Sequence, residues 1–131
     1  MSDLEEIERV INAYARNIDG RTPENFAAEV FAPDANVDTG FGLFIGVDEV
    51  IREYRVEMEK FEATVHMNSN FEIDIDGDTA SGTTNVAFWH WRKADVVKME
   101  VYLGAYIDRF VRLPEGWRIV HRRFRMFGPP D

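Results

Sequence analysis

In the first half of the chain, apolar residues recur at steps of three and four, the spacing of one helix face. The first such segment runs from Ser2 to Asp19, and Ser2 and Glu5 form an S-x-x-E capping box at its start. Gly20 follows, and it suits the left-handed conformation that ends many helices. The predicted apolar stripe of this helix consists of Leu4, Ile7, Ile11, Tyr14 and Ile18. We predict that all of these except Tyr14 are buried in the core.

Two further helices are predicted before the pattern changes. A short one opens at Thr22-Pro23, because proline is favoured at the first helical position, and Pro33-Asp34 ends it. A third covers about residues 47–61. Their predicted buried faces are Phe26, Val30 and Phe31 in the second helix, and Val47, Val50, Ile51, Tyr54, Met58 and Phe61 in the third.

After Ala63 the apolar positions alternate with polar ones, which is typical of strands that have one buried face. Asp76-Gly77-Asp78 is a hairpin turn signal between two such segments. Long strands are predicted up to this turn and over residues 79–92, 98–112 and 117–127, and shorter ones at 35–37 and 43–45.

Helices first and hairpin-linked strands afterwards indicate an α+β fold rather than alternating α/β. We predict a single domain over residues 1–131, a cone-shaped roll in which three N-terminal helices pack on a strongly curved, mixed, mainly antiparallel sheet. The interior of such a cone is either packed or left partly open as a ligand cavity.

Composition narrows the classes of function. Of 131 residues, 45% are hydrophobic and 30% charged, as in globular proteins, and the 15 basic and 24 acidic side chains give a net charge of −9. So acidic a chain argues against nucleic-acid binding, although the segment Arg118–Arg125 is basic. No apolar run approaches the roughly 20 residues of a membrane span, so no membrane partner is expected. The absence of cysteine fits a cytoplasmic protein.

The candidate chemistry lies in histidines and one aspartate, because phosphate-loop, dinucleotide, G-x-S-x-G and H-E-x-x-H motifs are absent. Asp19 ends the first helix, where the helix dipole disfavours a carboxylate by roughly 0.3–1 kcal/mol; it is either a solvent-exposed turn residue or a group that faces a cavity. His66 shares a strand face with Asn68 and Asn70, opposite Met67 and Phe71.

The other two histidines have structural explanations as well. His90 stands among Phe88, Trp89 and Trp91, where burial favours the neutral imidazole, and it is either a core residue or a site residue. His121 lies in the basic segment, where a structural role is expected. The three histidines lie on separate strands without close ligand spacing, so no metal site is predicted.

The order of elements resembles the nuclear transport factor 2-like superfamily, and especially its SnoaL-like branch. The resemblance rests on several short segments that follow one another over nearly the whole chain. They are Ile18-Asp19-Gly20, Phe31–Val37, Gly46, His66–Asn70, Asp76–Ala80 and Gly116–Ile119.

This resemblance implies a site. The pattern of scytalone dehydratase falls on Asp19, His66 and His90, the Asp–His pair is similar to that of γ-hexachlorocyclohexane dehydrochlorinase, and Tyr14 matches a tyrosine of bile-acid 7α-dehydratase. Those enzymes perform eliminations, so these four residues are the expected catalytic group. The residues expected to bind the substrate are Tyr102, Tyr106, Phe88, Asn68 and Phe41.

The implied activity is a lyase of the dehydratase type that needs no cofactor and acts on a small hydrophobic, aromatic or polycyclic molecule. A polyketide cyclase, an isomerase and a non-catalytic ligand-binding or dimerisation module stay open as alternatives, since one fold hosts many functions. Because a bent sheet leaves its outer face to be covered, a homo-oligomer is expected, either a trimer or a dimer.

Overall fold

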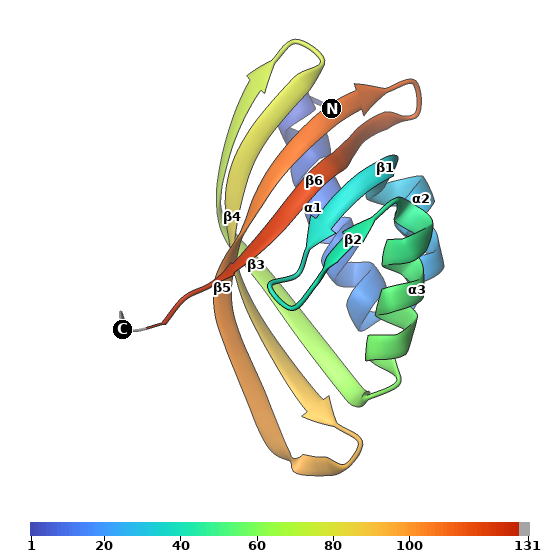
Figure 1. Ribbon diagram of the computed structural model, residues 1–131. Helices are drawn as coiled ribbons and strands as arrows, with labels where there is room; N and C mark the ends of the chain where they lie inside the picture. The colour runs from blue at the N-terminus through green and yellow to red at the C-terminus, as the bar shows by residue number, and fades with distance from the viewer. Residues whose placement is uncertain (129–131) are drawn as a thin grey trace.

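The computed structural model describes residues 1–128, except for the side chain of Val96. Its helices lie together on one face of a bent, six-stranded sheet (Figure 1). The strand order is β2-β1-β6-β5-β4-β3, with β1 parallel to β6 and every other neighbouring pair antiparallel. The predicted α+β architecture is confirmed, and the sheet built by the described residues is not closed into a barrel.

The elements follow the predicted order. The helices are α1 (Asp3–Asp19), the 3₁₀ helix η1 (Pro23–Asn25), α2 (Phe26–Glu29) and α3 (Val47–Met58). The strands are β1 (Phe31–Asp38), β2 (Leu43–Ile45), β3 (Phe61–Asp76), β4 (Thr79–Arg92), β5 (Asp95–Leu113) and β6 (Gly116–Met126). In the part of the chain that the structure describes, no helix has the length and apolar character to cross a membrane.

The two ends of α1 differ in how well the sequence predicts them. At its start the Glu5 amide donates to Ser2 Oγ at 3.1 Å, as the capping box predicts. At its end the prediction for Gly20 is wrong, because Gly20 stays right-handed with φ −83°. The left-handed residue is Arg21, with φ 61°. Its guanidinium donates to the carbonyls of Met58 at 2.7 Å and Phe61 at 3.0 Å, which ties the end of α1 to the start of β3.

The core lies between the helices and the concave face of the sheet, and it contains most of the predicted residues. Ile7, Ile11, Ile18 and Val50 are buried, and Ile51 and Tyr54 are partly buried against them. Leu4 is 45% exposed, so its predicted burial is wrong. The first turn of α1 instead meets the β5–β6 hairpin through polar contacts of Asp3 and Glu6.

Element ends differ from the prediction where the chain changes direction. The third helix ends at Met58 rather than near residue 61, and Phe61 opens β3. Pro33 does not separate the second helix from the strand that follows, because β1 already starts at Phe31 and contains the proline.

One irregularity in β3 changes which side chains face inward. The register with β4 shifts between Ser69 and Glu72, and Asn70 has φ 54°. Beyond this shift Phe71 packs against the core, on the same side of the sheet as His66, so its predicted place on the opposite face from His66 is wrong. The bulge thereby reverses the strict alternation on which the prediction relied.

Candidate active site

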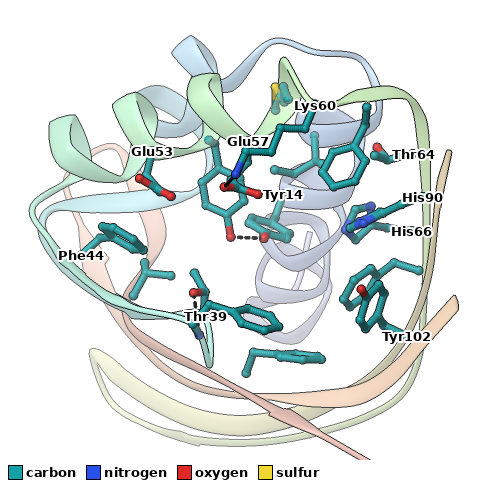
Figure 2. A pocket seen from close by; sticks show the side chains of 18 of the residues that line it. Tyr14, Thr39, Phe44, Glu53, Glu57, Lys60, Thr64, His66, His90 and Tyr102 are labelled. Atoms are coloured by element: carbon teal, nitrogen blue, oxygen red, sulfur yellow. Dashed lines mark hydrogen bonds and ion pairs between the residues drawn. The ribbon is translucent and has the colours of Figure 1, made fainter. Parts of the chain in front are cut away.

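A cavity of about 430 Å³ opens between the helices and the inner face of the sheet (Figure 2). Most of the residues expected at the site from the sequence contribute to its wall. Those that line it are Tyr14, Phe41, His66, Phe88, His90, Tyr102 and Tyr106. The interior is therefore open, as in a ligand site, and not filled by the many aromatic side chains of the chain.

Asp19 lies behind His66 and holds it by two contacts. Asp19 Oδ1 lies 2.7 Å from His66 Nδ1, and Asp19 Oδ2 accepts the His66 backbone N–H at 2.8 Å. The Thr64 hydroxyl donates to Asp19 Oδ1 at 3.0 Å. These three donors offset the unfavourable position of a carboxylate at the end of α1. The contact predicted between Asp19 and His66 is present in the structure.

The arrangement determines which nitrogen of His66 is free. An ionised carboxylate only accepts hydrogen bonds, so in the neutral imidazole Nδ1 carries the proton and Nε2 keeps its lone pair. The His66 side chain is 6% exposed and lines the cavity, while that of Asp19 is 27% exposed. The imidazole stacks on Phe88 with ring centroids 5.1 Å apart, which fixes the ring plane. Asp19 and Phe88 thus fix the orientation of an imidazole that lines the cavity.

His90 lies beside His66 on the neighbouring strand, with ring centroids 6.4 Å apart. Burial, and next the closeness of His66, lowers the pKa of His90 from 6.5 to about 4. His90 Nδ1 is buried without a hydrogen-bond partner among the described residues. His90 is consequently neutral at pH 7 and contributes an unpaired polar atom close to the cavity.

Three tyrosines gather at the inner end of the cavity. The hydroxyls of Tyr14 and Tyr54 are hydrogen-bonded to each other, and the rings of Tyr14 and Tyr106 meet edge to face at 5.6 Å. Burial raises the pKa of each of the three, so all of them stay protonated at neutral pH. They are donors, not bases.

Arg122 is a site residue that the sequence analysis does not identify. Its Nε and one terminal nitrogen, Nη2, each lie 2.8 Å from a carboxylate oxygen of Asp108, and both side chains are only 1% exposed. The guanidinium carbon lies 3.8 Å from the centre of the Tyr106 ring and 4.5 Å from that of Tyr14. Burial opposes its charge, but the charge and hydrogen bonds of Asp108 outweigh burial and raise the pKa of Arg122.

The third nitrogen of the Arg122 guanidinium, Nη1, differs from the two that contact Asp108. Nη1 is buried and has no hydrogen-bond partner among the described residues, and Arg122 lines the cavity. A buried N–H without a partner is costly, so a ligand oxygen that reached Nη1 would be stabilised there. The cavity wall therefore combines an imidazole held by a carboxylate with a guanidinium that keeps its charge.

Of the expected substrate-binding residues, Asn68 lies outside the cavity, whereas Phe41 lies at its edge. Asn68 is not among the residues that line the cavity, and its side-chain amide donates to Asn12 Oδ1 of α1 at 3.1 Å. Its expected contact with the substrate is therefore not supported, because α1 covers it. Phe41 contributes to the cavity wall from the β1–β2 loop and is 82% exposed, so it lies at the mouth.

His121 does not line the cavity, in keeping with the structural role expected from its sequence context. Within residues 1–128 no three side chains of His, Asp or Glu converge in a way that could hold a metal ion.

Comparison with known proteins supports this description of the fold. The sequence profile of the family described as "SnoaL-like domain" matches residues 1–123. The uncharacterized protein Rv2910c of Mycobacterium tuberculosis is 34% identical over 125 residues, which is 93% of this chain and 84% of that protein.

Solved structures with lower sequence identity share the fold. A provisionally assigned scytalone dehydratase from Novosphingobium aromaticivorans is 24% identical, with a TM-score of 0.87 over 95% of this chain and 84% of that one. A hexachlorocyclohexane dehydrochlorinase, LinA type 2, is 16% identical, with a TM-score of 0.84 over 96% of this chain and 93% of that one. A nuclear transport factor 2-like superfamily protein from Salmonella enterica is 21% identical, with a TM-score of 0.88 over 97% and 92%. The predicted resemblance is confirmed.

Proposed function

The chain belongs to the SnoaL-like domain family, and we propose that it is a lyase that eliminates water from a hydrophobic substrate. The observation that carries this proposal is the contact of 2.7 Å between Asp19 Oδ1 and His66 Nδ1, which leaves Nε2 of His66 free as a base. Solved relatives named as a dehydratase and a dehydrochlorinase, both elimination enzymes, support the reaction class.

The chemistry follows from the groups in place. His66 Nε2 takes a proton from a carbon next to a carbonyl group, and the electron pair of the C–H bond moves toward the carbonyl oxygen as an enolate forms. Asp19 stays ionised and stabilises the imidazolium. Arg122 Nη1, with the tyrosine hydroxyls near it, donates to the oxygen that gains charge.

The second half of the reaction restores the enzyme. The enolate electrons form a carbon–carbon double bond, and the bond to the departing hydroxyl breaks. His66 returns its proton to that oxygen, so water leaves and the imidazole is neutral again. The residues supply both proton transfers, and the proposed reaction needs no cofactor.

The alternatives differ in product. An isomerase would return the proton to another carbon without loss of water, and a cyclase would use the enolate to form a carbon–carbon bond. A binding module would leave its ligand unchanged. The open cavity next to an oriented base favours an enzyme over a binding module.

The test is a panel of cyclic and aromatic β-hydroxy ketones, followed by ultraviolet absorbance of the conjugated product and by mass spectrometry for loss of water. We expect turnover by the wild type, abolition by His66→Ala, and a loss of up to about 10⁴-fold in Asp19→Asn, because the imidazole then lacks the carboxylate that fixes its tautomer and balances its charge. His121→Ala is the matched control, since this histidine lies outside the cavity. Full activity in His66→Ala would contradict the proposal.

Self-association stays a prediction. Met67 and Leu103 both face Ala87 across their strand pairings, and they are 59% and 53% exposed on the outer side of the sheet. We expect a homo-oligomer, a trimer or a dimer, that covers this outer side. Sedimentation of a monomer at micromolar concentration would count against it.

A further inference from the structure

The charged side chains that line the cavity are mostly neutralised by partners within the chain. Lys60 Nζ lies 2.7 Å from Glu57 Oε1, Arg92 Nε lies 2.6 Å from Glu100 Oε1, and Arg122 is paired with Asp108. Each of these pairs leaves little net charge for a ligand to balance.

Glu53 is different. It is partly buried, it lines the same cavity from α3, and its carboxylate has no hydrogen bond or ion pair with the rest of residues 1–128. Glu57 lies one helical turn further along α3 and has a lysine partner that Glu53 lacks. A carboxylate that lines a cavity without a partner is an acceptor ready for a donor on a ligand.

A second unpaired group belongs to the same cavity. Arg122 is 1% exposed and its Nη1 has no partner within residues 1–128. Figure 2 shows Glu53 on one side of the open space, His66 and His90 on the other, and Tyr14 between them. The guanidinium carbon of Arg122 lies 4.5 Å from the centre of that Tyr14 ring. The cavity wall thus contains a charged guanidinium at its inner end and an unpaired carboxylate across the open space from the two histidines.

From the positions of Arg122 and Glu53 we infer that Glu53 is a specificity-determining residue. It selects cyclic substrates that carry a hydroxyl or amino group on the side of the substrate ring remote from His66. The inference rests on the proposed function only in placing the carbonyl oxygen at Arg122 and the reacting carbon at His66. It assigns the substrate class as a neutral or cationic ring compound with an acceptor at one end and a donor at the other.

The same carboxylate disfavours other ligands. A substrate with a carboxylate or phosphate in that place would put two negative charges close together in a partly dry cavity, which is unfavourable. An entirely apolar end would leave Glu53 desolvated without a hydrogen bond, which is also costly. A hydroxyl or amino group avoids both costs.

The test uses para- and meta-hydroxyacetophenone and their methyl ethers, which keep the carbonyl group and the ether oxygen but lack the donor. Binding is measured by NMR shift titration of the whole protein at about pH 6, where the phenols are neutral. The variants are Glu53→Gln and, as a matched control one turn along the same helix, Glu57→Gln. Each is checked for folding by thermal unfolding.

We expect the wild type and Glu57→Gln to bind at least one of the two phenols about tenfold more tightly than its methyl ether, as a hydrogen bond to a charged acceptor predicts. Glu53→Gln should lose this preference, because its amide donates to the ether oxygen as readily as it accepts from the phenol. Equal binding of phenols and ethers by the wild type, a preference that persists in Glu53→Gln, or no binding of any of the four would overturn the inference. Because binding is read without turnover, these results are independent of whether His66 acts as a base.

Discussion

Two acid–base pairs flank the cavity, and they are built differently. Asp108 and Arg122 are both 1% exposed and share two hydrogen bonds of 2.8 Å. Asp19 and His66 share one side-chain contact of 2.7 Å, and the Asp19 side chain is 27% exposed. In the first pair the guanidinium keeps its charge, whereas the second contains an imidazole, which has two ring nitrogens that can hold or accept a proton.

The difference shows how the two pairs divide the work of a site. A guanidinium remains charged throughout a reaction, so Arg122 suits the stabilisation of developing negative charge. An imidazole with one nitrogen fixed on a carboxylate suits proton transfer through the other. The role suited to Arg122 is compatible with full burial of the pair, whereas proton transfer by His66 requires that its ring face the cavity.

The largest expected effect is the change in the free energy of unfolding when the carboxylate of Asp108 or of Asp19 is replaced by an amide. Asp108→Asn leaves the buried guanidinium of Arg122 without its counter-charge, and it should lower the free energy of unfolding by about 3–5 kcal/mol. Asp19→Asn should change the same quantity by less than about 1 kcal/mol, because its surroundings are partly hydrated and an amide oxygen still accepts from the His66 backbone N–H. Urea unfolding of both variants measures the free energy of unfolding. Equal losses in the two variants would contradict the difference proposed between the two pairs.

A smaller effect is expected from the hydroxyl that supports Asp19. Thr64→Val removes the 3.0 Å hydrogen bond to Asp19 Oδ1 and should cost about 0.5–1.5 kcal/mol of unfolding free energy. Thr84→Val is the matched control, because Thr84 is 1% exposed and its hydroxyl has no partner among the described residues. That control should be neutral or stabilising. A loss as large in Thr84→Val as in Thr64→Val would show that the Asp19 contact is not the cause.

The smallest expected effect is the pH dependence contributed by His90, the cavity histidine without a carboxylate partner. Its pKa of about 4 in the folded chain lies below 6.5, so between these values the unfolded chain binds a proton that the folded chain does not. The free energy of unfolding should therefore fall as the pH is lowered from 6.5 toward 4. The charges that act on His90 include those of His66, Glu100, Arg92 and Glu57.

Urea unfolding at several pH values tests this for the wild type and His90→Gln, which cannot take up a proton. The loss of stability over this range should be shallower in the variant. Identical slopes would mean that His90 titrates normally in the folded protein.

The sequence predicts the two pairs unequally. Asp19 and His66 are recognised because a resemblance places them on the same cavity, although 47 residues separate them. Arg122 is missed because it is one of four arginines in a basic segment that looks solvated. Local alternation from the buried Trp117 and Ile119 would bring His121, not Arg122, to the inner face.

The shift that reorients Arg122 depends on pairing between strands. Arg109 pairs with His121 and Phe110 with Ile119, so Val120 is an extra residue in β6. The bulge turns Arg122 and Phe124 inward, and nothing in the sequence of β6 alone reveals it. A better signal is Asp108, an acidic residue in a strand of largely apolar character, which requires a buried partner.

The most direct test of the central claim is the protonation state of His66 itself, read from the nitrogen NMR shifts of its imidazole in the wild type and in Asp19→Asn above pH 7. Because Asp19 Oδ1 only accepts, the account predicts a single tautomer in the wild type, with the proton on Nδ1 and a bare Nε2. In Asp19→Asn that preference should weaken or disappear. A wild-type imidazole with its proton on Nε2, or a tautomer ratio that is unchanged by Asp19→Asn, would contradict the account, since His66 would then have no oriented lone pair toward the cavity.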